Sequence, residues 1–417
     1  MIRSFYIDNF KSLVNFRLPP APHALGPFVC LVGLNGAGKS TVLQALDFVA
    51  HLASGDIKAW LERREWRAAD IASRFLKRQL IHFKLELEAA PIGVITWEGQ
   101  FNTKLLRCTS ESVSVGGEAV LRISEQKLFA RMLPPKPSVP ALTRIYELPG
   151  LQYEGSTLSL LKAGQWDWAI EVLRESLYEL KSLDMLSPHA MRRRAKEGSD
   201  IGYGGERLSA YLHGMRKEEK ERLLAAARVF YPQLDSLTTR AVQAGWKDLS
   251  IDEHYLDAAG KPVQTPSRHV NDGLLRTLAV LAQSQLGGHL SGLQIAGVID
   301  TDAPVASVLF DEIENGINPE LVQKLVDHLL HAGPQVIVTT HSPLILNYLP
   351  DDVARQAVML LYRNEQGHTQ AARLFDLPSM QDKLGLLGPG EAYVDTDLSA
   401  LPIEAQRLAQ QPLEASA

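Results

Sequence analysis

One octapeptide constrains this chain more than any other feature. Residues 33–40 read Gly-Leu-Asn-Gly-Ala-Gly-Lys-Ser and fit the pattern G-x-x-x-x-G-K-[ST] at every fixed position. A continuous apolar run, Phe28–Val32, precedes them, and residues 40–52 carry apolar side chains spaced by three or four. A buried strand, a glycine-rich turn and a helix in this order form a loop whose backbone N–H groups wrap phosphates. The sequence therefore predicts an α/β fold that binds a nucleotide.

The loop also predicts which ligands the chain takes, namely ATP and Mg²⁺. We expect the Lys39 ammonium to reach the β- and γ-phosphates and the Ser40 hydroxyl to ligate Mg²⁺. The predicted nucleotide-binding residues of the loop are Asn35, Gly36, Ala37, Gly38, Lys39, Ser40 and Thr41.

Two further apolar runs end in polar side chains that fit the same chemistry. Val305–Phe310 is followed by Asp311 and Glu312, and Val336–Val338 leads to His341. Ligands of open α/β sheets bind at the carboxyl ends of the strands, so these groups should face the phosphates. Asp311 is predicted to hold the Mg²⁺ shell, Glu312 to orient or deprotonate the attacking water, and His341 to contact the γ-phosphate or that water. Lys39, Glu312 and His341 are the predicted catalytic residues.

Composition narrows the setting. The net charge of -5 excludes a globally basic nucleic-acid binder, so any DNA contact must be local or come through a partner. Two cysteines imply no disulfide framework, and the N-terminus lacks the apolar core of a signal peptide. Residues 277–299 carry no charged side chain, but polar residues and glycines interrupt them, which favours a buried helix and a loop over a membrane span. We therefore expect a cytoplasmic protein without a membrane partner.

Periodicity and punctuation predict the remaining elements. A strand is expected over Ile2–Val14, helices over Trp166–Leu186 and Glu206–Phe230, and a small β unit around Val358–Tyr362. The proline-rich segment Pro134–Pro149 is expected to be a connection.

The order of the three motifs resembles that of ABC-type ATPases, and more narrowly the RecF-like, SMC-related and OLD-type branch. The resemblance extends to Ile7–Ser12, Gly36–Thr41, Glu314–Pro319 and His341-Ser342-Pro343. It implies an ABC-type head with a parallel-core sheet, an antiparallel β part near the N-terminus and a helical insert. The implied division is an N-terminal ATPase lobe over 1–150, a mostly helical insert over 151–265 and a C-terminal ATPase lobe over 266–417.

In such ATPases a signature segment of one subunit closes the ATP site of the other, which implies a homodimer or higher oligomer. The segment that matches is Asn271-Asp272-Gly273, a glycine-containing turn at the start of a helix. Asn271 stands where serine is usual, and a plain helix N-cap is the alternative interpretation. A glutamine that senses Mg²⁺ in relatives has two candidates here, Gln79 and Gln100.

The resemblance points to bacterial ATPases that partner a separately encoded nuclease or other effector, often in antiphage defence. A RecF-like repair ATPase is the near alternative, and the cytosolic motor of a transporter is the distant one. The chain is expected to be the bare ATPase, because few residues follow His341 and no nuclease pattern is found among them. The basic run Met191–Lys196 fits either a DNA-phosphate clamp or a solvated loop.

Overall fold

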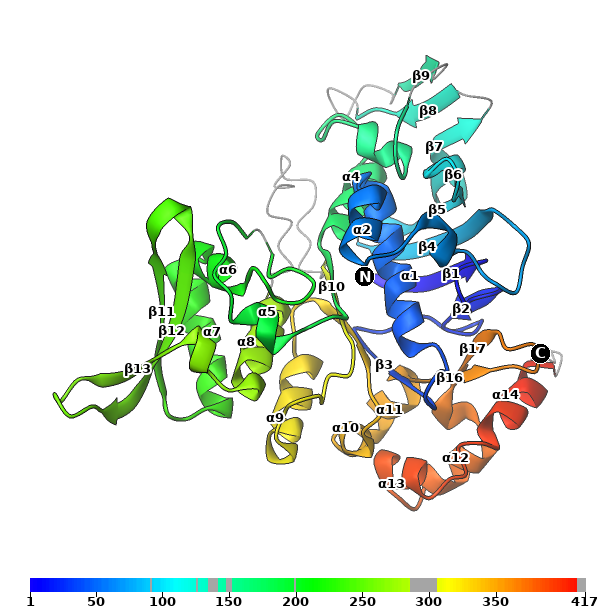
Figure 1. Ribbon diagram of the computed structural model, residues 1–417. Coiled ribbons are helices and arrows are strands. Elements are labelled where there is room, and N and C mark those ends of the chain that lie inside the picture. The colour runs from blue at the N-terminus through cyan, green and yellow to red at the C-terminus, as the bar shows by residue number, and fades with distance from the viewer. Residues whose placement is uncertain are drawn as a thin grey trace.

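The computed structural model describes residues 1–90, 92–124, 127–133, 142–147, 152–198, 200–285 and 306–410. Within these residues the chain forms a core sheet, an antiparallel sheet and a small sheet in the insert (Figure 1). The mixed α/β fold predicted from the sequence is confirmed, with a parallel core and an antiparallel part near the N-terminus.

The core sheet has the strand order β10-β14-β15-β3-β16-β17. Its strands are β10 (Leu180–Leu183), β14 (Ser307–Phe310), β15 (Gln335–Thr339), β3 (Phe28–Val32), β16 (Val358–Arg363) and β17 (Thr369–Arg373). The first five run parallel and β17 returns antiparallel. Every residue of β3, β14 and β15 is buried, as expected for parallel strands that are covered on both faces.

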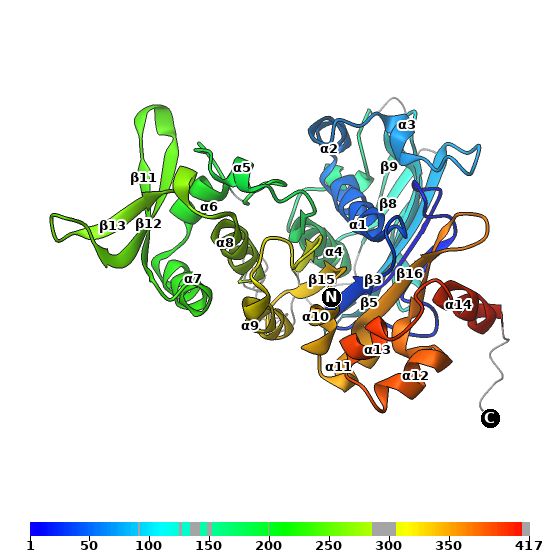
Figure 2. The ribbon, with the colours of Figure 1, turned by 60° about the horizontal axis from the view of Figure 1, so that its bottom comes forward.

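The two faces of this sheet pack against different elements. Leu309 and Ile337 belong to the core that includes α1 (Lys39–Ser54) and the antiparallel sheet, whereas Val308 and Val338 belong to the core of α8 (Asp272–Ser284) and α9 (Pro319–Leu330). Two views agree with this layering, since α1 lies beside the antiparallel sheet and α8 and α9 lie beside the insert (Figures 1 and 2). The phosphate-loop helix and the predicted signature helix therefore cover opposite faces.

The antiparallel sheet has the order β2-β1-β4-β5-β6-β7-β8-β9. Its strands are β1 (Ile2–Asp8), β2 (Phe16–Leu18), β4 (Leu80–Ala89), β5 (Gly93–Asn102), β6 (Arg107–Val115), β7 (Glu118–Ser124), β8 (Lys127–Arg131) and β9 (Thr143–Glu147). The predicted strand over Ile2–Val14 is too long, because Asn9 and Lys11 adopt positive φ angles of 67° and 46° and turn the chain back into β2. Strand β9 falls inside the expected connection Pro134–Pro149, whose other residues lie largely outside the described part.

The insert departs from the expected helices at two places. The predicted helix Trp166–Leu186 ends early: α4 (Trp168–Tyr178) is followed by β10, because these residues pair in parallel with β14. The predicted helix Glu206–Phe230 is divided in two by Met215, whose backbone is extended. The helices there are α5 (Pro188–Met191), α6 (Leu208–Gly214) and α7 (Lys217–Phe230).

The insert also holds a sheet, which the prediction of a mostly helical segment did not include. Its strands are β11 (Leu234–Ala241), β12 (Lys247–Leu256) and β13 (Pro262–Pro266). The division of the chain at residues 150 and 265 stays a prediction.

Short helices complete the two lobes. They are α2 (Ile57–Arg63), α3 (Ala68–Ile71), α10 (Pro343–Asn347), α11 (Asp351–Ala357), α12 (Pro378–Leu384), α13 (Pro389–Val394) and α14 (Leu401–Gln410), with 3₁₀ turns at Thr157–Leu160, Gln243–Gly245, Ser267–His269 and Leu374–Asp376. The apolar stretch 277–299 is helical up to Ser284, and its remainder from residue 286 lies outside the described residues. None of the described helices is long and apolar enough to cross a bilayer.

Candidate active site

The phosphate loop is packed tightly onto the hairpin of β16 and β17. Gly33 and Gly38 have φ angles of 145° and 107°, which side-chain-bearing residues rarely adopt. A Cβ atom on Gly33 would collide with the carbonyl oxygen of Leu361, and one on Gly38 with the hydroxyl of Thr369. The glycines of the motif therefore serve both the turn and its close approach to neighbouring backbone.

Lys39 is held over the loop that it ends. Its Nζ donates to the carbonyl oxygens of Gly33 at 2.9 Å and Leu34 at 3.4 Å, and lies 3.5 Å from Nδ1 of His341. Burial lowers the pKa of Lys39, and the nearby carboxylates, Asp311 first among them, act in the opposite direction. The ammonium thus sits between the loop and the carboxyl ends of β14 and β15, where phosphates would need a counter-charge.

Hydrogen bonds connect Asp311, a predicted Mg²⁺ ligand, with Thr339 and with Ser40, the other predicted ligand. The Thr339 hydroxyl donates to Oδ1 of Asp311 and accepts from the backbone N–H of Glu312 at 2.8 Å. Burial raises the pKa of Asp311, while hydrogen bonds from Thr339 and Ser40 oppose that rise. Ser40 and Asp311 therefore meet, although they are far apart in sequence.

The oxygen atoms of Ser40 and Asp311 suit a Mg²⁺ ion that keeps several of its waters, and they do not form a complete protein metal site. Among the described residues no group of three or more His, Cys, Asp and Glu side chains could hold a metal ion. Ser40 and Asp311 offer two oxygen ligands, and Mg²⁺ is commonly bound by one or two protein oxygens together with waters and substrate phosphates.

Glu312 and His341 face each other beside this group. Nε2 of His341 lies 4.0 Å from Oε1 of Glu312, and both side chains are partly exposed. The backbone N–H of His341 donates to Oε1 of Glu314 at 2.8 Å, which fixes the end of β15 to the loop after β14. Glu312 has a φ angle of 47°, a strained conformation of the kind that clusters at functional sites.

Sequence reasoning missed three residues that shape the loop and the carboxylates. Thr339 directly follows the apolar run Val336–Val338, but its hydrogen bond to Asp311 depends on a contact between residues that are distant in sequence. Thr369 donates to the Ala37 carbonyl oxygen at 2.9 Å, and Nε of Arg363 donates to the Gly36 carbonyl oxygen at 2.8 Å. Arg363 and Thr369 follow the loop by more than 300 residues, and no local pattern marks them.

The predicted signature segment lies apart from this site. The Asn271 side chain caps α8 by accepting from the Leu274 N–H at 2.7 Å, and both Asn271 and Asp272 are exposed. A Cβ atom on Gly273 would lie 2.6 Å from the Gly316 carbonyl oxygen, so the turn packs against the loop after β14. Because α8 and α1 cover opposite faces of the core sheet, the structure does not bring Asn271, Asp272 and Gly273 to the phosphate loop of their own chain.

The basic run Met191–Lys196 is largely engaged within the chain. Arg192 donates to the Val270 carbonyl oxygen at 2.7 Å and pairs with Asp272, while Arg194 pairs with Asp248 at 3.0 Å. Arg192 thus connects the insert to the start of α8. Neither of the two interpretations of this run, a DNA-phosphate clamp or a solvated loop, included such a contact within the chain.

Neither candidate for a Mg²⁺-sensing glutamine is found among the contacts of the loop. Gln100 belongs to β5 and lines a cavity on the antiparallel sheet, and the Gln79 carbonyl oxygen accepts from Thr103. Asp184, which directly follows β10, lies near Asp311, because β10 is the parallel neighbour of β14.

A cavity of about 500 Å³ adjoins the helical end of the phosphate loop. Its walls include Lys11, Thr41, Trp66, Phe75 and Arg363. The cavity therefore has both aromatic and positively charged walls, and it lies next to the predicted phosphate site.

Lys11 in this cavity predicts a pH dependence of stability. Burial lowers its pKa to about 8, from an ordinary value of 10.5, so the fold favours the neutral amine. Between about pH 8 and 10.5 the unfolded chain binds the proton that the folded chain releases, and the free energy of unfolding should rise with pH. Urea unfolding at pH 7 and pH 9.5 should show this gain in the wild type and not in Lys11→Met; an equal gain in both would contradict the assignment.

Comparisons with known proteins show which family the chain belongs to. Residues 28–89 and 174–347, more than half of the chain, match the family described as "AAA domain, putative AbiEii toxin, Type IV TA system". An OLD nuclease of Thermus scotoductus is 30% identical over 109 residues, which are 26% of this chain and 18% of the nuclease. The chain thus spans less than a fifth of the length of that relative.

Solved structures show likeness over most of the chain. An SMC head bound to the C-terminal winged-helix domain of ScpA is 13% identical, with 89% of this chain and 96% of that chain covered and a TM-score of 0.49. The recombination mediator RecF is 12% identical, with 90% and 98% covered and a TM-score of 0.42. The chain belongs to this AAA-domain family, whose model matches more than half of its residues.

Proposed function

We propose that two copies of this chain sandwich two ATP molecules, hydrolyse them to ADP and phosphate, and thereby control a DNA-acting partner. One observation carries the proposal. At one sheet edge Asp311 is hydrogen-bonded to Ser40 and to the Thr339 hydroxyl, which also accepts from the Glu312 N–H, while the matching signature segment lies on the far face of the same sheet. A second subunit can supply that segment, and a C₂ dimer supplies it twice.

Each residue of the site has a role that its position allows. Lys39, already between loop and carboxylates, would bind the β- and γ-phosphates. Ser40 and Asp311 would hold Mg²⁺, which neutralises phosphate charge when it is bound. Glu312 would orient or deprotonate the attacking water, and His341, at 4.0 Å from it, would hydrogen-bond the water or the γ-phosphate.

The cavity beside Thr41 would take the rest of the nucleotide. It continues from the helical end of the loop, where the base and ribose must lie once the phosphates occupy the loop. Trp66 and Phe75 offer aromatic surface to a base, and Arg363 reaches this space while holding the Gly36 carbonyl oxygen.

The partner is proposed to be a separately encoded nuclease or other effector in bacterial antiphage defence. The family description names a toxin–antitoxin system, and the relative from Thermus is a nuclease. Both support an ATPase that works with an effector more than the cytosolic motor of a transporter. A RecF-like repair ATPase is the second candidate. The motifs around Ile7–Ser12 and Gly36–Thr41 support this role as much as they support the defence role.

The first test is nucleotide binding by Lys39→Ala. The change removes a charge-assisted contact to the phosphates, so ATP affinity should fall by about 10- to 100-fold. Lys220→Ala is the control, because its Nζ also donates to a backbone carbonyl oxygen, that of His213, far from the loop. Titration with a fluorescent ATP analogue decides the matter, and wild-type affinity in Lys39→Ala would refute the assigned role.

The second test concerns the partner. Phosphate release should be measured with and without DNA, with Lys39→Ala as the background. Stimulation by DNA supports the defence and repair roles. Copurification with a membrane protein, without stimulation by DNA, would contradict both and favour a transporter.

A further inference from the structure

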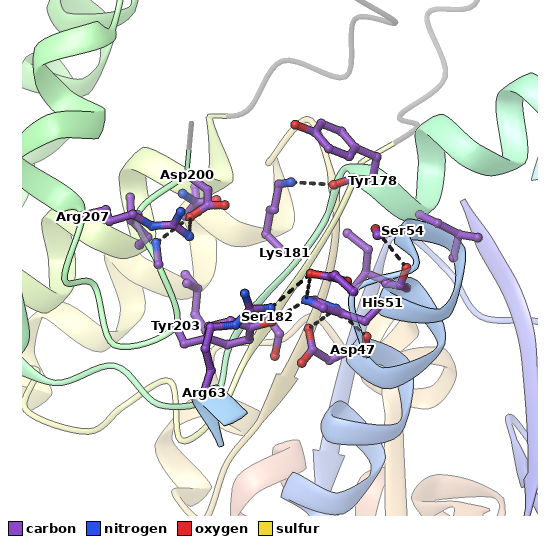
Figure 3. A pocket seen from close by; sticks show the side chains of 18 residues that line it. Asp47, His51, Ser54, Arg63, Tyr178, Lys181, Ser182, Asp200, Tyr203 and Arg207 are labelled. Carbon is purple, nitrogen blue, oxygen red and sulfur yellow. Dashed lines mark hydrogen bonds and ion pairs between the residues drawn. The ribbon is translucent and has the colours of Figure 1, made fainter. Parts of the chain in front are cut away.

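A second cavity lies away from the phosphate loop, and we call it the insert cavity (Figure 3). Its volume is about 300 Å³, the lower end of the range in which small ligands bind. Helix α1 provides one wall with His51, strand β10 another with Lys181, and the loop 200–207 a third with Tyr203 and Arg207. None of the residues that line it belongs to the phosphate loop.

Several buried polar atoms at this cavity have no hydrogen-bond partner among the described residues. Gln283 of α8 is 1% exposed, and both its Oε1 and its Nε2 are unpaired. Nε of Arg207 and Oδ1 of Asp56, two further lining residues, are also buried and unpaired. Buried polar groups are almost always paired, and a primary amide offers both an acceptor and donors. The walls thus present unpaired hydrogen-bond donors and acceptors, which a bound ligand with matching polar groups would pair.

Within the part of the chain that the structure describes, the Lys181 ammonium at this cavity forms no ion pair with a carboxylate. The two guanidinium groups are balanced, since Arg207 pairs with Asp200 and Arg63 pairs with Asp56 at 3.2 Å. Within the described residues the Lys181 ammonium donates only to the Tyr178 carbonyl oxygen and lies over the ring of the same tyrosine. A bound anion would give Lys181 a partner of opposite charge, because ammonium and guanidinium donors bind phosphate through charge-assisted hydrogen bonds.

We propose that the insert cavity binds a nucleoside monophosphate as an effector. The phosphate would lie against Lys181 and Nε of Arg207, and the base edge would pair with the amide of Gln283. A glutamine amide matches the neighbouring donor and acceptor on a base edge in a bidentate way. A ligand with only one of these halves would leave either the charge or the buried amide unsatisfied.

An occupant would touch the elements that frame the catalytic carboxylates. Asp47 lines the cavity and accepts from Arg64 at 2.7 Å, and Arg64 also donates to both carboxylate oxygens of Asp184 at 2.8 and 2.9 Å. These three side chains are each 1% exposed. The network joins α1, which begins at Lys39, to the end of β10, beside the strand β14 that Asp311 directly follows.

Calorimetric titration of the whole Lys39→Ala chain tests the site with weaker competition from the phosphate loop. The probes are AMP, GMP, CMP, UMP, ribose 5-phosphate and inorganic phosphate. At least one nucleoside monophosphate should bind once per chain, and Lys181→Gln should weaken it by about 10-fold or more, the size of one charge-assisted contact. Gln283→Leu should abolish the preference for that nucleotide over ribose 5-phosphate.

Two controls keep the result interpretable. Lys324→Gln should leave binding unchanged, because this exposed lysine also donates to a backbone carbonyl oxygen, that of Val229, outside the cavity. Gln283→Leu removes an amide that has no partner, so its melting temperature should not fall. Absence of saturable binding at millimolar concentrations overturns the proposal, as does binding that neither cavity variant changes. Equal affinity for inorganic phosphate and every nucleotide overturns the assignment to a nucleoside monophosphate.

Discussion

Replacing Glu312 with glutamine is expected to reduce ATP turnover by about 10²- to 10⁴-fold, the usual size of a general-base effect. Glutamine keeps the length and hydrogen bonding of the side chain but cannot take a proton. The partly exposed carboxylate faces His341 and has no ion-pair partner other than this histidine within the described residues. Nucleotide binding should persist, since Lys39 and the loop glycines are unchanged.

The measurement is single-turnover hydrolysis beside equilibrium ATP binding. Glu320→Gln is a matched control, an exposed carboxylate in the first turn of α9. It should hydrolyse ATP like the wild type. Normal turnover in Glu312→Gln would remove Glu312 from the mechanism.

The second large effect is expected from Asn271→Asp. Oδ1 of the new carboxylate can still cap α8, as Asn271 does through the Leu274 N–H, and aspartate is as good an N-cap as asparagine. A negative charge is also favourable at a helix N-terminus, so the isolated chain should remain folded. In a dimer, however, the charge would face the γ-phosphate bound by the other subunit. Hydrolysis should therefore fall by about 10²- to 10³-fold, as when a transition-state donor is lost, while ATP binding to the single chain is kept.

An isosteric change is preferable to a bulky one at this segment. Gly273→Arg would also block a partner, but its Cβ atom would lie 2.6 Å from the Gly316 carbonyl oxygen and disturb the chain's own loop. Asn102→Asp is the matched control, because Asn102 also caps a turn, accepting from Lys104 and Leu105, on the antiparallel sheet. If Asn271→Asp hydrolyses ATP normally, the signature is misplaced or the site works without a partner.

The parts of the site that could be predicted are those with a local pattern. The phosphate loop is encoded by adjacent glycines, and Asp311 and Glu312 directly follow a buried strand, so their shared edge followed from parallel strand geometry. The helix N-cap at Asn271, the alternative to a signature, is equally local, and its side chain accepts from the Leu274 N–H in the first turn of α8.

The parts that escaped prediction depend on contacts between distant residues. Leu180–Leu183 continue the apolar spacing of α4, and only pairing with β14 makes them a strand. Asp184 and Arg64 lie 120 residues apart, and nothing in either neighbourhood marks a buried ion pair. The hairpin of β16 and β17 reaches the phosphate loop through Arg363 and Thr369, which have ordinary surroundings in the sequence.

Sedimentation velocity distinguishes a dimer that forms around ATP from a chain that binds and hydrolyses ATP alone. ATP inside the interface stabilises the dimer by mass action, and a variant that cannot hydrolyse ATP preserves that state. Glu312→Gln with ATP and Mg²⁺ should sediment as a dimer at concentrations where the nucleotide-free protein is a monomer, and adding Asn271→Asp should return it to a monomer. The same sedimentation with and without ATP, or an ATP-dependent dimer that survives Asn271→Asp, would contradict the account.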